Sequence, residues 1–103
     1  MNQFHDLELV IDTNPCKFTL NKQDITHGMR VEVLWTNGKK SKHTICIREV
    51  QRHFYYKGDD YPYIVNTPFI TVKKNGERFD MMLEATSERV NPNIKLRIVE
   101  KSS

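Results

Sequence analysis

Two short basic segments carry the cations best suited to binding phosphate groups in this sequence. They are NGKKSKH (37–43) and KKNGER (73–78), and each surrounds an Asn-Gly pair. Lysine and arginine side chains neutralise phosphates and release counterions, which gives binding with little sequence preference. Lysines also keep exposed turns soluble, so the charge alone leaves both interpretations open. The candidate nucleic-acid-binding residues are Lys39, Lys40, Lys42, His43, Lys73, Lys74 and Arg78.

The segment QRHFYYKGDDYPYI (51–64) contains all four tyrosines of the chain. Its centre, KGDD, predicts a turn, because Gly58 accepts positive φ and aspartate side chains bond nearby amides. The flanking residues are then the two arms of a hairpin. Such an aromatic cluster suits packing on the sheet, a protein-facing surface, or a platform on which single-stranded bases stack. The candidate partner-binding residues are Arg52, Phe54, Tyr55, Tyr56, Tyr61 and Tyr63.

The sequence gives less support to a metal site or to a hydrolytic enzyme. The four histidines are scattered and Cys16 and Cys46 form no Cys-x-x-Cys pair, so we expect no metal site and no cofactor. The sequence has no phosphate loop and no Gly-x-Ser-x-Gly motif. A metal-independent ribonuclease could use His43 or His53 as base, Arg52 to stabilise charge and Tyr55 as donor. An enzyme is therefore only the third interpretation.

The elements that must position these residues are strands. Asn37-Gly38 and Asn75-Gly76 each lie between alternating apolar segments, and Asn-Gly is typical of type I′ hairpin turns. Further alternating segments are LELVI (7–11), CKFTL (16–20), YPYIV (61–65) and IKLRIV (94–99). We predict one all-β domain over residues 1–103. Six to eight strands would form a small antiparallel β-barrel or sandwich, in which closure would remove exposed edges.

The segment GMRVEVLWTNG (28–38) resembles in outline a strand of small SH3-like or Tudor-like barrels. It has a glycine, alternating valines, an aromatic residue and then a tight turn. The resemblance spans these eleven residues and implies a barrel of that size.

Composition and charge limit the expected partners and cellular compartment. The chain has 103 residues, a net charge of +3 and a pI near 8.9, which permits nucleic acid or an acidic protein surface as partner. No apolar run reaches the roughly 18–20 residues of a membrane helix, and the first segment has no basic signal-peptide region. Two cysteines outside any dense framework are expected to be free thiols in a cytoplasmic protein.

The combined expectation is a non-catalytic domain that binds single-stranded or duplex nucleic acid, or acts as a regulatory module. The basic hairpin tips would contact phosphate and the tyrosines would contact bases or sugars. The alternative is a protein-interaction module, such as an inhibitor or adaptor, that uses the tyrosine-rich hairpin 52–64 with Arg52 as anchor. Because Pro62 lacks an N–H, the 61–65 segment is expected at a sheet edge, where it could also pair a homodimer.

Overall fold

The chain forms only strands in the part that the structure describes. The computed structural model describes residues 3–56, 59–85 and 94–99, with the side chains of 54–56 and 59–61 left aside. No helix is present in these ranges, and so none that could cross a membrane. The strands are β1 (Leu7–Val10), β2 (Cys16–Leu20), β3 (Gln23–Asp24), β4 (Arg30–Leu34), β5 (Lys40–Thr44), β6 (Cys46–Tyr56), β7 (Asp59–Lys74), β8 (Glu77–Met82) and β9 (Lys95–Ile98).

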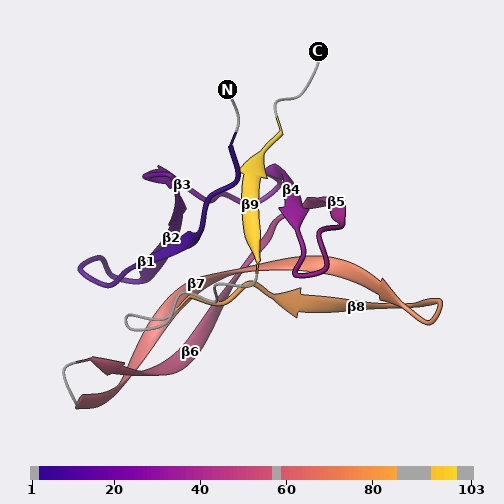
Figure 1. The fold of residues 1–103 in the computed structure, drawn as a ribbon. Coiled ribbons are helices and arrows are strands. Elements are labelled where there is room, and N and C mark those ends of the chain that lie inside the picture. The colour runs from indigo at the N-terminus through magenta and orange to yellow at the C-terminus, as the bar shows by residue number, and fades with distance from the viewer. Residues whose placement is uncertain (1–2, 57–58, 86–93, 100–103) are drawn as a thin grey trace.

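These nine strands form two sheets (Figure 1). The larger sheet has the order β1-β2-β7-β6, with β3 added to β2 and β8 added to β7; the smaller sheet has the order β5-β4-β9. The all-β prediction is therefore confirmed, and the predicted count of six to eight strands is too low. Neither sheet closes into a barrel within the described residues.

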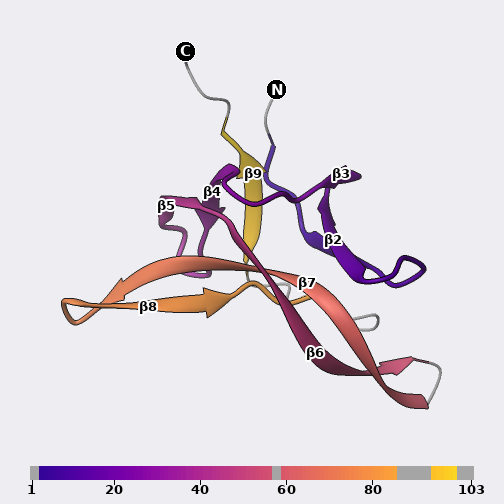
Figure 2. The same cartoon turned by 180° about the vertical axis from the view of Figure 1, so that it is seen from behind.

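Strand β7 is the central strand of the larger sheet, because β2, β6 and β8 all pair with it. Along one edge it pairs with β6, from Tyr56↔Asp59 to Cys46↔Phe69. Along the other edge it pairs first with β2 and then with β8, which starts at Phe69↔Met82. Two separate strands were expected here, but the ladder continues through Asn66, Thr67 and Pro68. Beyond Phe69, the edge that β6 has left is open towards β5, as the two views in Figures 1 and 2 show.

The smaller sheet packs its apolar face against the larger sheet. Val31 and Val33 of β4 and Leu96 of β9 are fully buried, whereas Glu32 between the two valines is only half-buried. They belong to one core cluster with Phe18 of β2 and with Val65 and Ile70 of β7. The period-two alternation predicted for β4 is thus the signal that decides which face of the smaller sheet meets the core.

The two Asn-Gly turns differ. Asn75 and Gly76 both have positive φ, 54° and 81°, which confirms the type I′ turn between β7 and β8. At the first turn only Gly38 has positive φ, 83°, and the Trp35 N–H bonds the Lys39 carbonyl at 2.8 Å. This hairpin therefore has a three-residue loop, Thr36–Gly38, and the prediction of a type I′ turn there is wrong.

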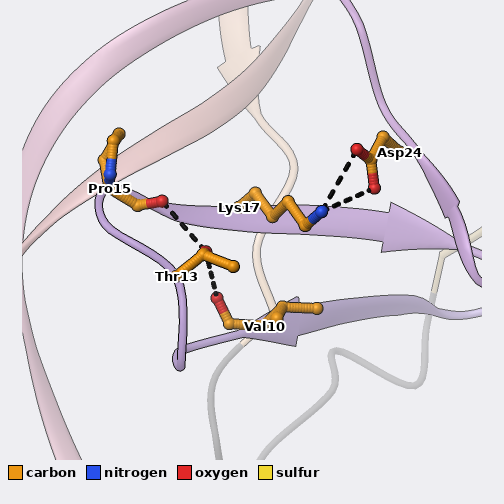
Figure 3. A network of polar contacts seen from close by, with 5 residues as sticks. All are labelled: Val10, Thr13, Pro15, Lys17 and Asp24. Atoms are coloured by element: carbon orange, nitrogen blue, oxygen red, sulfur yellow. Dashed lines mark hydrogen bonds and ion pairs between the residues drawn. The ribbon is translucent and has the colours of Figure 1, made fainter.

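Polar contacts hold the first hairpin of the chain (Figure 3). The Thr13 hydroxyl donates to the Pro15 carbonyl at 3.0 Å, within the connection from β1 to β2. Lys17 Nζ lies 3.0 Å from Asp24 Oδ1 and so ties β2 to β3. Both side chains of this pair are well exposed, so its contribution to stability is at most about 1 kcal/mol. Cys16, at the start of β2, and Cys46 are both free thiols.

Candidate functional site

An open hollow lies between β5 and the free edge of β7. Its volume is about 590 Å³, within the usual range for ligand sites. Four lysines and a histidine contribute to its wall, and no aspartate or glutamate does. The lining residues are Trp35, Asn37, Lys39, Lys40, Ser41, Lys42, His43, Thr71, Val72 and Lys73. Residues from both basic segments, one at each Asn-Gly turn, therefore line the hollow.

A chain of hydrogen bonds crosses this hollow. Trp35 Nε1 lies 2.6 Å from Ser41 Oγ, Ser41 Oγ lies 2.6 Å from His43 Nε2, and His43 Nδ1 lies 3.1 Å from the Thr71 carbonyl oxygen. A carbonyl only accepts, so His43 Nδ1 must carry a hydrogen. In the neutral imidazole Nε2 is then the acceptor, and the Ser41 hydroxyl donates to it. The indole N–H of Trp35 donates to the remaining side of Ser41 Oγ.

The surroundings of His43 favour the neutral form of its imidazole. Burial lowers the pKa of the imidazole, and the charge of Arg30 lowers it further, against the opposing effect of the Thr71 hydrogen bond. The ring also packs edge-to-face on Trp35, with 6.1 Å between the ring centroids and an interplanar angle of 82°. Its position and its tautomer are therefore both fixed.

Ser41 and His43 have the hydrogen bond of a nucleophile–base pair, but the rest of such a site differs. Trp35 Nε1–H occupies one lone pair of Ser41 Oγ. The group that orients His43 is a neutral carbonyl, whereas a carboxylate would also stabilise the imidazolium formed on proton transfer. This arrangement is better suited to presenting polar groups to a ligand than to abstracting a proton from one.

The predicted basic residues are only partly brought together. Along β5, Lys40 and Lys42 alternate with Ser41 and His43 and so extend to the other face of the strand. Lys40 Nζ lies 5.7 Å from the centroid of the Phe4 ring. Both lysines still contribute to the lining of the hollow. On β7, Lys73 borders the hollow from the opposite wall.

The remaining two candidates lie beside the hollow. Arg78 of β8 is directly opposite Lys73 in the ladder and shares its face, whereas Lys74 is the next residue and alternates to the other face. Neither Lys74 nor Arg78 lines the hollow.

In the described residues, the cations at the two Asn-Gly hairpin tips differ from most other cations in whether a carboxylate pairs with them. Ion pairs hold five described cations elsewhere: Lys17 with Asp24, Arg48 with Asp80, Arg52 with Glu84, Lys95 with Asp6, and Arg97 with Glu32. Among the residues that the structure describes, no carboxylate pairs with any of the six tip cations. These are Lys39, Lys40, Lys42, Lys73, Lys74 and Arg78.

The tyrosine-rich hairpin lies on the other arm of β7. Its register pairs Phe54 with Tyr61 and Tyr55 with Asp60, while Lys57, Gly58 and the side chains of 54–61 lie outside the description. Tyr63 is half-buried. Arg52, proposed as an anchor, has a side chain only 15% exposed and pairs with Glu84 at 3.2 Å.

Two expectations for this arm need correction. His53 pairs with Pro62, nine residues along β7 from Thr71, which is about 30 Å of extended strand. The version of the ribonuclease set that uses His43 with Arg52 and Tyr55 is therefore not assembled. The version that uses His53, the neighbour of Arg52 in β6, stays untested, because the side chain of Tyr55 lies outside the description. The 61–65 segment is a sheet edge as expected only up to residue 64: β6 pairs with one side, and on the other side Val65 pairs with Cys16. Only 61–64 has a side without a paired strand in the described residues.

Three residues of the hydrogen-bond chain were not predicted as part of a site. Ser41 could have been found, because it is two residues from His43 on a strand and so shares its face. Trp35 packs against the core and also lines the hollow. The sequence does not single out Thr71, because this residue takes part through its backbone carbonyl, a group that every residue has.

Comparisons with known proteins do not extend this picture. No protein-family model matches the sequence, and no curated protein or solved structure matches it. In the described ranges, no cluster of three or more His, Cys, Asp or Glu side chains could hold a metal ion. The function must therefore be argued from the hollow and its surroundings.

Proposed function

We propose that this protein is a non-catalytic nucleic-acid-binding domain, and that the hollow between β5 and β7 binds the phosphate backbone. One observation carries the proposal: six cations with no carboxylate partner among the described residues flank a hollow whose described wall has no acidic residue. Unpaired lysines attract phosphate and release its counterions, whereas paired cations would first have to leave their partners.

The cross-strand pair Lys73 and Arg78 supports an anionic ligand. Like charges directly opposite each other destabilise a sheet. A phosphate group near both side chains would remove this repulsion. The repulsion between Lys73 and Arg78, which destabilises the unbound protein, would then be absent from the complex.

The wall of the hollow also suits a single strand. Trp35 and Val72 give it an apolar part beside the lysines, against which a base or a sugar can pack. We therefore expect single-stranded nucleic acid to bind more tightly than a duplex of the same length.

Fluorescence anisotropy with labelled single-stranded and duplex oligonucleotides tests the proposal, at about 50 mM and about 200 mM salt. Binding is expected to weaken with salt, with a log–log slope of about −2 to −3 for three to four phosphate contacts. A variant with Lys39, Lys42 and Lys73 changed to alanine should lose most of the affinity.

The matched control changes Lys17, Lys22 and Lys95 to alanine, which removes the same net charge from residues that do not line the hollow. It should bind nearly as well as the wild type. Equal losses in both variants would show that only net charge matters, and no binding of either oligonucleotide at low salt would end the nucleic-acid proposal.

A protein-interaction module is the second candidate. The observation that favours it is the exposure of two large apolar side chains on the larger sheet, Ile64 at 45% and Phe79 at 44%. Neither borders the hollow. If the oligonucleotides do not bind, these residues and the tyrosine-rich hairpin 52–64 are where a protein partner should be sought.

For the architecture, we infer that residues 1–103 form one domain and that the two sheets act as a small β-sandwich. The supporting observation is that Val31, Val33 and Leu96 of one sheet and Phe18 and Ile70 of the other belong to one core cluster. Independent folding of the whole chain in a single unfolding transition would test both points.

A further inference from the structure

Ser41 is the junction of the hydrogen-bond chain in the hollow. Its oxygen accepts from Trp35 Nε1–H, and its hydrogen is committed to Nε2 of the neutral His43 imidazole. While His43 is neutral, Ser41 therefore offers an oxygen but no hydrogen to a ligand in the hollow. An anion would find no hydroxyl donor there.

Protonation of His43 reverses one bond of this chain. An imidazolium donates from both nitrogens, so Nδ1–H still bonds the Thr71 carbonyl while Nε2–H now donates to Ser41 Oγ. Ser41 then accepts from Trp35 and from His43, and its own hydrogen must turn to a third partner. Ser41 lines the hollow, so that hydrogen can be directed at a ligand oxygen.

We propose that the hollow takes up one proton on His43 when it binds a phosphate group, and that the Ser41 hydroxyl then donates to the phosphate. This inference rests on the proposed function and adds to it the linkage of binding to pH. The ligand class is an anion whose oxygens accept hydrogen bonds. The proton comes from solvent, and no covalent bond forms or breaks.

The charges around His43 explain why the proton and the anion must arrive together. The charged groups near it on other elements are cationic: Arg30 of β4 lowers its pKa, and Lys39, which precedes β5, and Lys73 of β7 line the same hollow. Asp80 of β8 also bonds Thr71, through its hydroxyl at 2.9 Å, but that carboxylate is already paired with Arg48. Without a ligand the cations oppose an imidazolium, and the negative charge of a bound phosphate counteracts their effect.

The pKa of His43 is lowered in the unbound protein, chiefly by burial. If the anion raises this pKa, affinity must fall as pH rises between the unbound and the bound pKa, approaching tenfold per pH unit for one linked proton. Phosphodiester groups do not titrate in this range, so the pH dependence reports on the protein.

The first test is the affinity of a labelled ten-nucleotide oligothymidylate between about pH 6 and about pH 8, at constant low salt. The wild type is expected to bind more tightly at the acidic end, by up to about tenfold per pH unit. His43→Gln should lose this dependence, whereas His53→Gln, on the other arm of β7, should retain it. Ser41→Ala should weaken binding by about tenfold at the acidic end, because the hydroxyl no longer donates.

The second test is NMR of the imidazole nitrogens of the wild-type protein, with and without sulfate, which does not titrate in this range. The unbound protein should show His43 as the neutral Nδ1–H tautomer, and sulfate should raise its pKa. Oligonucleotide binding that is independent of pH, or equally dependent in His43→Gln, would overturn the proton linkage and leave the proposed function standing. If neither oligonucleotide nor sulfate binds, both proposals fail.

Discussion

His43 Nδ1 lies 3.1 Å from the carbonyl oxygen of Thr71, a residue 28 positions further along the chain. No backbone ladder joins β5 to β7 in the described residues, so this side-chain bond links two strand edges that belong to different sheets. It holds the β4–β5 hairpin beside β7 and so sets one dimension of the hollow. Nδ1 carries the hydrogen of this bond in both protonation states, so the link persists when His43 is protonated.

The first prediction concerns pH and stability. The folded-state pKa of His43 lies below its unfolded value, so the unfolded chain binds the proton more readily. The stabilisation is fully present above about pH 6.5 and is lost as the pH falls towards the folded-state pKa. Urea denaturation at several pH values should show a loss of unfolding free energy that is smaller in His43→Gln. An equal pH dependence in both proteins would contradict this account.

A second prediction is that Thr67→Val stabilises the protein. Thr67 is fully buried in β7, and its Oγ1 has no hydrogen-bond partner among the described residues. An unsatisfied buried hydroxyl costs free energy, and valine has nearly the same shape. The free energy of unfolding should rise by about 1 kcal/mol. Thr71→Val is the control, because its hydroxyl donates to Asp80 and its loss should not stabilise. Destabilisation by Thr67→Val would mean that this hydroxyl has a partner.

Burial should decide the cost of removing apolar side chains. Leu96 is fully buried between the sheets, so Leu96→Ala should lower the free energy of unfolding by about 2–5 kcal/mol. Ile64 is 45% exposed, and Ile64→Ala should cost much less, about 1 kcal/mol or under. Chemical denaturation of both variants measures the contrast. Similar losses would place Leu96 outside the core.

The second Asn-Gly turn gives a backbone prediction. Gly76 has φ of +81°, and a Cβ built there meets no atom within 4 Å, so strain in φ is the only obstacle to a side chain. Gly76→Ala should therefore destabilise by about 1–2 kcal/mol. Asn75→Gly, at φ 54°, keeps the allowed conformation and should change stability by less than about 1 kcal/mol. Thermal unfolding of the two variants would reveal the difference, and a neutral Gly76→Ala would exclude strain at this turn.

Local sequence patterns predicted much of the fold. The strand CKFTL was predicted at its observed bounds, and the Asn75-Gly76 turn has its expected conformation. These features depend on neighbours within a few residues, where alternation and turn chemistry act directly. The first turn differs because Asn37 keeps negative φ and a third residue completes the loop, a choice between two turn types that both suit Asn-Gly.

The site was harder to predict, for a physical reason. Its chemistry depends on the contact between His43 and the carbonyl of Thr71, which any residue could provide. The opening of the hollow depends on β6 leaving β7 at Phe69, which no local pattern specifies. Single residues of the site, such as Lys39 and His43, could be selected by type, but the hydrogen-bond chain from Trp35 through Ser41 and His43 to Thr71 required the tertiary structure.

The parallel pairing of β2 with β7 has a consequence for how the chain acquires its structure. Cys16 and Lys17 pair with Val65 and Asn66, so this part of β2 must wait for residues 49 positions later in the chain. Closing so long a loop is slow, because its entropy is lost before any contact repays it. During synthesis on the ribosome, the β1–β2 hairpin and the pairing of β2 with β3 can form early, yet Cys16 and Lys17 lack their β7 partners until β7 emerges. The interval between these events is when the nascent protein is most exposed to pairing with the wrong strand.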